Sequence, residues 1–418
     1  MEEKVLTGLF GLKDIFKIDV YLKHDGYRAV HKALEEMEPT SILEEVKAAN
    51  LRGRGGAGFP AGVKWSFVPK DVEKTKYLCV NADEGEPGTF KDRYIMVHNP
   101  HLLLEGIIIT SFCVGIHTAF IYIRGEYETI AQRLEQSISD AVGRGFLGKN
   151  ILGTGFDLDV FVHRGAGAYI CGEETALLES LEGKRGNPRL KPPFPASVGL
   201  FGCPTVINNV ETIANIPQII LGGAEKFCDL GLPKDGGTRI FGVSGMVKNP
   251  GIYELPVGTT LKDIIFKHAG GMSGDKTLKA VIPGGLSAPV LTSEEIDTPM
   301  DFDSLCEVQS MLGSAAIIVI DEETAMLDVL KVVSKFYSHE SCGQCTPCRV
   351  GNSWINKIVK RMADGKGKDG DIDNIIRLAS NILGKTLCPL GDAAAMPILS
   401  IANKFRDEIQ SAMGSGLK

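Results

Sequence analysis

Apolar and polar positions change period several times along the first half of the chain, and each period predicts a type of element. Apolar residues at helical spacing alternate with short apolar runs that are typical of buried strands. We expect a helix, a strand, a helix, a strand, a helix and a strand, in that order, at residues 26–50, 77–82, 102–116, 118–123, 126–142 and 158–162. Within the first, Ser41 and Glu44 have the spacing of a capping box. Strands that alternate with helices predict an α/β fold with a mostly parallel sheet covered on both faces.

The second half of the chain has a different pattern. Short strands and turns, with one helical stretch at residues 261–269, predict a small α+β region. Later helical stretches, near 325–338, 349–362, 371–384 and 392–412, predict an antiparallel bundle. We therefore divide the chain into N-terminal helices with a glycine-rich loop, an α/β domain, an α+β domain and a helical domain, at residues 1–70, 71–237, 238–325 and 326–418.

One apolar segment, Leu102 to Ile123, is almost long enough to span a bilayer. It contains Glu105 and His117, and its second part has a β-like composition. The segment therefore predicts a buried helix followed by a buried strand, and no direct membrane insertion.

Composition narrows the class of protein further. The chain of 418 residues contains 49 glycines, against roughly 29 expected from an average usage of about 7%. The formal net charge of −7 argues against a nucleic-acid binder, which would present a basic face. Acids at positions 2 and 3 argue against a presequence. We therefore expect a cytoplasmic chain whose ten cysteines are thiols or metal ligands.

The densest glycine run, Gly53 to Gly62, holds five glycines in ten residues, and Lys64 follows with a mobile positive charge. Exposed backbone N–H groups in such a run form an anion-binding concavity. The strand at 77–82 then leads into an acidic turn with three carboxylates that could accept hydrogen bonds from a cofactor, Asp83, Glu84 and Glu86. The run matches neither a dinucleotide fingerprint nor a Walker loop, so a flexible linker with an acidic turn remains an alternative.

A second glycine loop, Gly165 to Gly172, lies between a strand and a helix start, which is typical of nucleotide binding. Tyr169 could stack on a ligand ring or pack internally, and Glu173 and Glu174 could be ordinary acids of a first helical turn. Further on, a proline-rich loop at residues 186–204 could hold two side chains rigidly over a site, Lys191 and Phe194. Two candidate helix caps follow it, Asn208 and Asn209.

The sharpest chemical signal is the cysteine motif Cys342-x-x-Cys345-x-x-Cys348, with Cys388 followed by a proline. Three cysteines at this spacing with a remote Cys-Pro are typical of a [4Fe–4S] site. Structural zinc more often uses two separated pairs or Cys/His mixtures, and His339 is the only imidazole near the motif. The motif therefore predicts an iron–sulfur cluster in the helical domain.

In their order along the chain, these motifs resemble one family: the NADH-oxidising, flavin-bearing subunit of respiratory complex I, with the related diaphorase subunits of NAD-linked hydrogenases and formate dehydrogenases. The resemblance covers nearly the whole chain and rests on four motifs, at residues 53–60, 81–88, 167–174 and 340–348. It implies a Rossmann-like, mostly parallel FMN/NADH domain, then a β-grasp-like domain of the soluble-ligand-binding type at 239–325, then a C-terminal four-helix bundle that carries the Fe–S cluster.

The resemblance also implies which residues surround each cofactor. FMN is expected among Gly53, Arg54, Gly55, Gly56, Lys64, Asn81, Asp83, Glu84, Tyr169, Gly172, Asn208, Asn209 and Thr212. NAD(H) is expected with its adenine half near Phe59, Phe67, Lys191 and Phe194, and with its ribose or nicotinamide half near Glu86, Glu173 and Glu174. The cluster ligands are Cys342, Cys345, Cys348 and Cys388. No catalytic side chain is expected, since hydride passes between cofactors and Glu86 only positions them.

The implied function is NADH oxidation, with hydride transfer to FMN and single-electron transfer through the [4Fe–4S] cluster toward quinone. Carboxylates near the cofactor favour NAD over NADP. The expected partners are a small [2Fe–2S] subunit and a larger iron–sulfur subunit of the peripheral arm, on the inner face of a bacterial plasma membrane. A hydrogenase or formate dehydrogenase diaphorase is the alternative, although no [2Fe–2S] module precedes the glycine loop as it does in many of them. A zinc-stapled binding module without cofactors is a third hypothesis.

Overall fold

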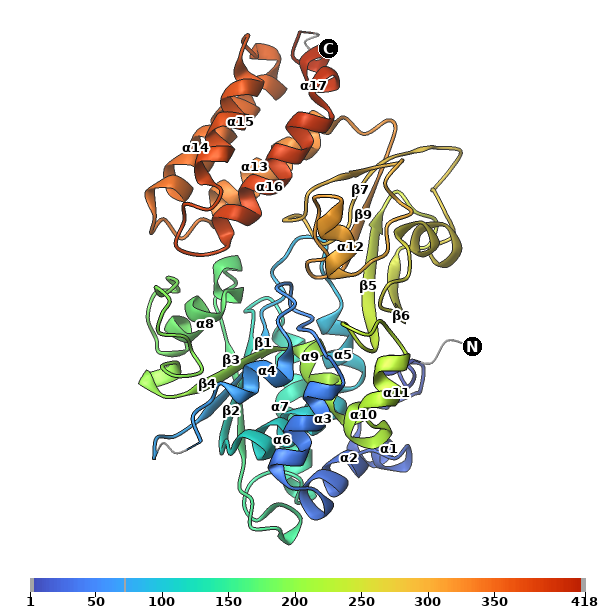
Figure 1. Cartoon of the computed structure of the whole chain (residues 1–418), viewed down its shortest axis with the longest axis vertical. Coiled ribbons are helices and arrows are strands. Elements are labelled where there is room, and N and C mark those ends of the chain that lie inside the picture. The colour runs from blue at the N-terminus through green and yellow to red at the C-terminus, as the bar shows by residue number, and fades with distance from the viewer. Residues whose placement is uncertain (1–3, 71–72, 415–418) are drawn as a thin grey trace.

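The computed structural model describes residues 4–70 and 73–414, so the acids at positions 2 and 3 lie outside the described residues. Three regions follow one another along the chain: a sheet covered by helices, a second sheet with short helices, and a helical region at the C-terminus (Figure 1). These regions confirm the predicted fold class.

The first sheet is entirely parallel, with the order β3-β2-β1-β4. Its strands are β1 (Tyr77–Ala82), β2 (Thr118–Ile123), β3 (Asp159–Arg164) and β4 (Thr205–Asn209). The first two were predicted at these bounds, the third runs two residues further than predicted, and the fourth was not predicted as a strand. Because parallel strands end at the same edge of a sheet, the acidic turn, the second glycine loop and the asparagine pair meet there.

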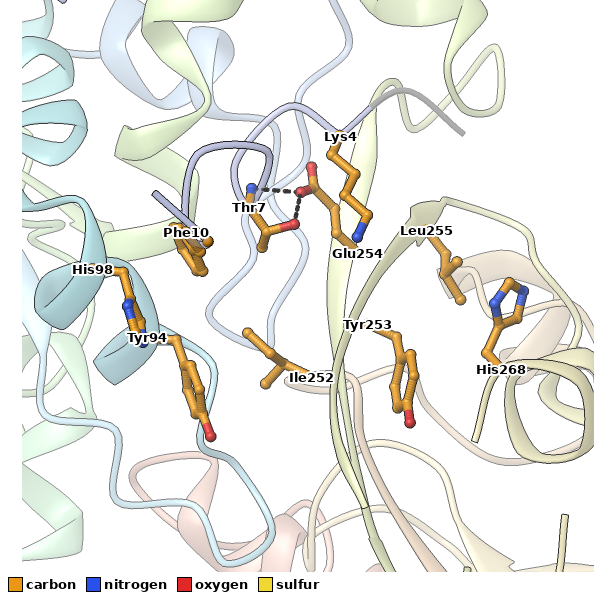
Figure 2. A pocket seen from close by; sticks show the side chains of 11 residues that line it. Lys4, Thr7, Phe10, Tyr94, His98, Ile252, Tyr253, Glu254, Leu255 and His268 are labelled. Atoms are coloured by element: carbon orange, nitrogen blue, oxygen red, sulfur yellow. Dashed lines mark hydrogen bonds between the residues drawn. The ribbon is translucent and has the colours of Figure 1, made fainter. Parts of the chain in front are cut away.

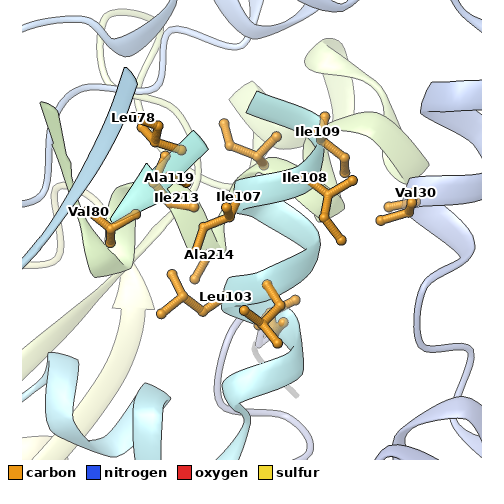
Figure 3. Packing of buried hydrophobic residues seen from close by; sticks show 14 of the residues in the cluster. Val30, Leu78, Val80, Leu103, Ile107, Ile108, Ile109, Ala119, Ile213 and Ala214 are labelled. Carbon is orange, nitrogen blue, oxygen red and sulfur yellow. The ribbon is translucent and has the colours of Figure 1, made fainter. Parts of the chain in front are cut away.

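Helices cover this sheet, and the apolar segment lies among them. The helices of this region beyond the glycine loop are α4 (Ala61–Ser66), α5 (Asp92–His98), α6 (Pro100–Val114), α7 (Glu128–Gly143), α8 (Glu174–Leu181), α9 (Val210–Ala214), α10 (Ile216–Gly222) and α11 (Ala224–Asp229). Helix α6 is buried along most of its length, and Ile107 and Leu103 pack toward the strand residues Leu78 and Val80 (Figure 3). A side chain on Gly106 would meet the Ile213 carbonyl at 2.1 Å, so this glycine lets α9 approach α6.

Helix α6 also forms the first part of the apolar segment whose length suggested a possible membrane span. Among the described residues, no single helix is long and apolar enough to cross a bilayer. Taken together, helices α5 and α6 have the length and apolar composition of a membrane span, but the chain bends by 103° at their junction. The predicted buried helix followed by a buried strand is confirmed.

The helix predicted at residues 26–50 is wrong as a single element. The chain instead forms α1 (Ile18–Lys23), α2 (Arg28–His31), a π-helical turn (Lys32–Glu36) and α3 (Pro39–Ala48). Helix α3 starts at a proline, which fixes the φ of its own residue and keeps the preceding residue out of the helical region. Ser41 therefore lies inside α3, and the predicted capping box is also wrong.

The second region is built on a mixed sheet of order β6-β5-β9-β7-β8. Its strands are β5 (Thr238–Gly245), β6 (Gly251–Pro256), β7 (Leu278–Ile282), β8 (Leu291–Thr292) and β9 (Ala316–Asp321). The predicted helix at 261–269 is a π-helix over Asp263–His268, and a further short helix, α12 (Phe302–Glu307), was not predicted.

The helical region contains α13 (Met326–Glu340), α14 (Thr346–Arg361), a π-helical turn (Met362–Lys366), α15 (Asp371–Ile382), α16 (Leu390–Lys404) and α17 (Arg406–Gly414). The helix predicted at 392–412 is divided at Phe405. Helix α14 begins three residues earlier than predicted, so Cys348 lies in its first turn.

The N-terminal segment fastens the second region to the first. The buried carboxylate of Glu254 on β6 accepts hydrogen bonds from the backbone N–H groups of Val5 (2.7 Å), Leu6 (2.9 Å) and Thr7 (2.7 Å). The Thr7 hydroxyl donates to the same carboxylate (Figure 2). The Thr238 hydroxyl donates to it as well. A hollow of about 450 Å³ lies beside this contact, away from the glycine loops.

Candidate functional site

The first glycine loop is a short hairpin whose tip leaves backbone N–H groups available. A bridge between Arg52 and Pro60 closes the hairpin. Within the described part of the chain, the N–H groups of Gly55, Gly56 and Ala57 donate no hydrogen bond to protein atoms. A Cβ on Gly56, at φ +129°, would meet nothing within 4 Å, so the tip faces open space. Adjacent free N–H groups fit an anion such as a phosphate.

Arg54 holds the base of this loop from inside the protein. Its guanidinium is fully buried, pairs with Asp235 at 2.5 Å and donates to the carbonyls of Gly236 (2.7 Å) and Thr238 (3.2 Å). Its backbone N–H donates to the Thr212 hydroxyl at 2.8 Å. The side chains of Arg54 and Thr212 are therefore hydrogen-bonded within the protein. The resemblance implied that both residues surround FMN.

Glu84 of the acidic turn is also used internally. Its fully buried carboxylate accepts from the Asp92 N–H (2.6 Å), the Arg93 Nε (3.0 Å) and the Tyr127 hydroxyl (2.9 Å). Burial, followed by the nearby Asp92, raises the pKa of Glu84 to about 7 although Arg93 acts against it. Glu84 thus anchors the start of α5 and does not face the open edge of the sheet.

Asp83, by contrast, has a carboxyl group without a protein partner. It is 2% exposed, and among the described residues none donates a hydrogen bond to this carboxyl. Burial raises its pKa to about 7, although Arg124 acts in the opposite direction. Side chains on Gly85 and Gly172 would meet the Asp83 Oδ2 at 3.1 and 3.2 Å, so the carboxyl lies between the acidic turn and the second glycine loop. A buried carboxyl in this state is suited to a hydrogen bond with a ligand.

Glu86 and Tyr169 are bound to each other. The Tyr169 hydroxyl donates to Glu86 at 2.6 Å, and the Ser287 N–H of the second region donates to the same carboxylate at 2.8 Å. Burial raises the pKa of Glu86. The Tyr169 ring packs edge-on against Phe336 and Tyr337 of α13, with ring centroids 5.1 and 6.1 Å apart. The Tyr169 ring therefore packs within the protein, which is one of the two roles considered for it.

Two lysines and two glutamates form a charged group beside these loops. Lys64 of α4 pairs with Glu174 at 2.9 Å, and Lys191 pairs with Glu174 at 2.6 Å and Glu173 at 3.2 Å. Burial acts to raise the pKa of Glu174, but the two lysines outweigh it and lower the pKa to about 2. The Lys64 charge, predicted to be mobile, is thus held in an ion pair from helix α4, and Lys191 lies against the two glutamates.

Glu173 has a second role at the start of α8. Its Oε2 accepts from the backbone N–H groups of Thr175 and Ala176, both at 2.9 Å, so it is the N-cap of this helix. The capped helix N-terminus keeps its positive end close to the charged group.

Three phenylalanines lie exposed on the loops around this group. Phe59, Phe67 and Phe194 are 48%, 57% and 59% exposed, and the rings of Phe59 and Phe67 are 6.1 Å apart. Exposed aromatic faces of this kind suit a planar ring from solution.

The asparagines at the sheet edge form hydrogen bonds within the protein. Asn81 donates to the Gly172 carbonyl at 2.8 Å, and Asn208 accepts from the Trp65 indole at 2.8 Å. Asn209 is the N-cap of α9, as predicted, and its amide also donates to Asp92. Asn208 lies in β4 and is not a cap.

The four cysteines gather at one end of the helical region. Cys348 is buried, its sulfur accepts from the Asn352 amide at 3.3 Å, and the Ser341 hydroxyl lies 3.2 Å away. Burial, and then charges that include Cys342, raise the pKa of Cys348 and raise that of Cys388 to about 12. In the part of the chain that the structure describes, no three His, Cys, Asp or Glu side chains converge closely enough to hold a metal ion. Four thiols in one place are nevertheless the donor set of a [4Fe–4S] cluster.

The cysteine loop and the second glycine loop touch. The Tyr169 N–H donates to Glu340 at 3.1 Å, two residues before Cys342, and Arg185 donates to the Cys342 carbonyl at 3.1 Å. Glu173 also contributes to the raised pKa of Cys388, after burial as the main cause. The two candidate sites are therefore neighbours in the fold.

Sequence reasoning missed several residues that support these loops. Lys91 is buried between Asp92 (2.8 Å) and Glu211 (2.6 Å), beneath the first glycine loop, and only the adjacent charges after the acidic turn could have indicated it. Ser287 and Glu340 reach the site from other regions. No local pattern marks Ser287, and Glu340 stands in the motif at 340–348 without any sign that it contacts the second glycine loop.

Comparison with known families agrees with this geometry. Residues 46–218 match the Nuo51 FMN-binding domain, residues 240–290 match the SLBB domain, and residues 328–412 match the NADH-ubiquinone oxidoreductase-F iron-sulfur binding region. The cofactor site and the cysteine site described above lie within the first and the last of these matches.

Several known proteins are similar to this chain over nearly its whole length. The second F-type subunit of NADH-quinone oxidoreductase in Rhizobium meliloti is 52% identical over 408 residues, which cover 98% of this chain and 97% of the relative. The F-type subunit of Mycobacterium tuberculosis is 50% identical over 403 residues, covering 95% of this chain and 90% of that protein. A crystal structure of an NAD⁺-reducing [NiFe]-hydrogenase superposes with a TM-score of 0.84 at 33% identity, covering 98% of this chain and 67% of that one. From its site geometry, domain matches and full-length relatives, this chain belongs to the family of F-type subunits of NADH-quinone oxidoreductase.

Proposed function

We propose that the chain oxidises NADH with FMN held at the edge of the parallel sheet, and that electrons leave through a [4Fe–4S] cluster held by the four cysteines. The observation that carries this proposal is the contact between the two sites, through Tyr169 and Glu340. A cofactor at the sheet edge and a cluster at the cysteine loop would be neighbours, as electron transfer between them requires.

The protein groups that we assign to FMN are the ones without internal partners. The N–H groups of Gly55, Gly56 and Ala57 would receive its phosphate, and the buried carboxyl of Asp83 would contact its polar atoms. Gly53 and Gly172 shape the site through their backbones, which are hydrogen-bonded within the protein. Arg54, Glu84, Asn81, Asn209 and Thr212 support the site from behind, because their side chains are already bound within the protein. Among the described residues, the Asn208 side chain is bound through its Oδ1 only.

The groups that we assign to NADH are exposed or held by ion pairs. Phe59, Phe67 and Phe194 offer ring faces to the adenine. Lys64 and Lys191 neutralise Glu173 and Glu174, and exchange of these ion pairs for contacts with a dinucleotide is the role that we give them. Both carboxylate oxygens of Glu86 accept hydrogen bonds from the protein, one from Tyr169 and one from Ser287. We therefore assign Glu86 the role of a positioning residue that holds Tyr169.

The chemistry itself comes from the cofactors: bound FMN accepts a hydride, and a [4Fe–4S] cluster accepts one electron at a time. The chain supplies orientation and electrostatics. Its ligands for the cluster are Cys342, Cys345, Cys348 and Cys388, and Asn352 donates to one of these sulfurs.

The relatives are parts of larger assemblies, so we propose partner subunits for this chain too. We infer a small [2Fe–2S] subunit and a larger iron–sulfur subunit of the same complex, at the inner face of a bacterial plasma membrane. The structural similarity to a hydrogenase favours a diaphorase role as the second candidate. Identification of the subunits that co-purify with the chain separates the two.

The test is spectroscopic. The full-length chain, produced with iron and riboflavin in excess, should show flavin absorption and a broad iron–sulfur shoulder that NADH bleaches. A colourless protein with stoichiometric zinc would contradict the proposal and favour a zinc-stapled binding module.

A further inference from the structure

The loops that carry the cofactor site rest on the second region of the chain, and this contact is built around one aromatic residue. Phe302 starts α12 in the second region. Its ring lies directly against the first glycine loop: a Cβ on Gly58, at φ +66°, would be 2.4 Å from the Phe302 Cζ and 2.6 Å from its Cε1. The absence of a side chain at Gly58 is therefore what lets the ring reach the loop.

Two arginine side chains lie against the same Phe302 ring. The guanidinium of Arg52, at the base of the loop, is 4.2 Å from the centroid of the Phe302 ring. The guanidinium of Arg239, on β5, is 5.0 Å from it. Arg52 also donates from Nε to the Gly58 carbonyl at 2.8 Å, which joins the ring, the loop base and the loop tip in one group of contacts.

Arg239 depends on this ring. It is fully buried and forms no ion pair with any described carboxylate, and its Nε has no hydrogen-bond partner among the described residues. Its two hydrogen bonds, to the carbonyls of Gly313 and Gly53, are both 3.4 Å long. Burial and the nearby Arg54 lower its pKa to about 10. A desolvated guanidinium in this position gains most from an aromatic face.

The acidic turn also contacts the second region through hydrogen bonds. The Leu286 N–H donates to the Pro87 carbonyl at 3.1 Å, and the hydroxyls of Thr89 and Ser314 are 2.5 Å apart. Together with the Glu86 and Ser287 contact, these bonds fix the turn from the side of the second region.

We propose that Phe302 is a positioning residue for the flavin: by filling the space at Gly58 and lying against the guanidinium groups of Arg52 and Arg239, it holds the first glycine loop in the conformation that presents its N–H groups. The second region is then a buttress of the cofactor site. This inference rests on the proposed function, since it concerns the same FMN loop.

The experiment measures flavin release and not turnover. Full-length chain purified with FMN is diluted, and the rise of flavin fluorescence gives the release rate. Phe302→Ala and Phe302→Leu should release FMN about tenfold faster than the wild type, the factor that corresponds to about 1.4 kcal/mol. Phe302→Leu keeps most of the apolar volume and serves if Phe302→Ala does not fold. The [4Fe–4S] signal in electron paramagnetic resonance should stay unchanged in both.

The matched control is Phe266→Ala, which removes a phenylalanine that is 44% exposed in the same region and lies against Gly271 instead of Gly58. It should release FMN at the wild-type rate. Equal release rates for Phe302→Leu and the wild type would overturn the proposal. A wild-type chain that carries no FMN would instead overturn the proposed function.

A double-substitution cycle tests the contact itself. Gly58→Ala should speed release strongly in the wild type, because the new methyl group displaces the ring. In the Phe302→Ala background the methyl group has room, and only the backbone strain at positive φ remains. The two effects should therefore be less than multiplicative. Effects that simply multiply would show that the ring does not act through Gly58.

Discussion

The sheet edge and the cysteine loop are built in different ways, although they are neighbours. At the sheet edge, protein contacts shape the loops in advance: Arg54 is locked to Asp235, Glu84 to the start of α5, and Glu86 to Tyr169. At the cysteine loop, the protein gathers thiols, but no group among the described residues is arranged as a finished metal site.

This difference indicates which interactions order the residues of each site: protein contacts at the sheet edge, and the bound cluster at the cysteine loop. A loop that is already held needs little further ordering when its cofactor binds, so affinity depends on residues behind the site. The four thiols would gain their final arrangement from the cluster, since metal binding and local folding are coupled. Substitutions behind the sheet edge should therefore weaken a preformed site, whereas loss of one thiol should abolish the other site.

The largest effect is expected from Cys388→Ala, which removes one of the four proposed cluster ligands. The variant should lose the [4Fe–4S] signal in electron paramagnetic resonance and most of its iron, while it keeps FMN. Cys306→Ala, which removes an exposed thiol on α12, is the control and should keep the cluster. An intact cluster in Cys388→Ala would mean that another residue is the fourth ligand.

Next in size is Asp235→Ala, which leaves the buried Arg54 guanidinium without its partner. We expect a loss of about 3–5 kcal/mol in the free energy of unfolding, measured with urea. Asp303→Ala breaks a more exposed pair with Arg52 and should cost less than about 1 kcal/mol. Equal costs for the two variants would contradict the view that the base of the loop is preformed by a buried ion pair.

Asp83 should give the sheet edge a pH dependence. Its pKa is raised to about 7 by burial, so the folded chain favours the protonated form. The stabilisation is complete below the ordinary pKa of 3.8 and is lost as the pH rises through about 7. Relative to the wild type, Asp83→Asn should gain about 2–4 kcal/mol in unfolding free energy between about pH 4 and about pH 8. Asp369→Asn, at an exposed position, should show no such gain; a constant difference for Asp83→Asn would contradict the assignment.

The smallest effect is expected from Glu86→Gln, because the amide keeps the size of the side chain and an oxygen for the Ser287 N–H. Loss of the charge weakens the hold on Tyr169, so kcat/KM for NADH with ferricyanide should fall about tenfold while the FMN content stays unchanged. Glu294→Gln, an exposed change in the second region, is the control. Unchanged kinetics would show that Glu86 has no part in positioning.

The local sequence was sufficient for the elements that one period or one motif specifies. The short apolar runs at 77–82 and 118–123 are strands at the predicted bounds, and Asn209 is a helix cap. The cysteine spacing and the two glycine loops indicated the cofactor chemistry, because backbone N–H groups and thiols act through residue type and spacing alone.

Tertiary structure alone decided which way the polar side chains of the site face. Arg54 and Glu84 stand in the same motifs as Gly56 and Asp83, yet the first two point into the protein, where Asp235 and the start of α5 satisfy their charges. Their partners lie on other elements, and no local pattern announces them. The contact of Phe302 with Gly58 joins residues more than two hundred positions apart, so it could not be predicted for the same reason. Packing between regions depends on how the two sheets are placed relative to each other, and short stretches of sequence do not contain that information.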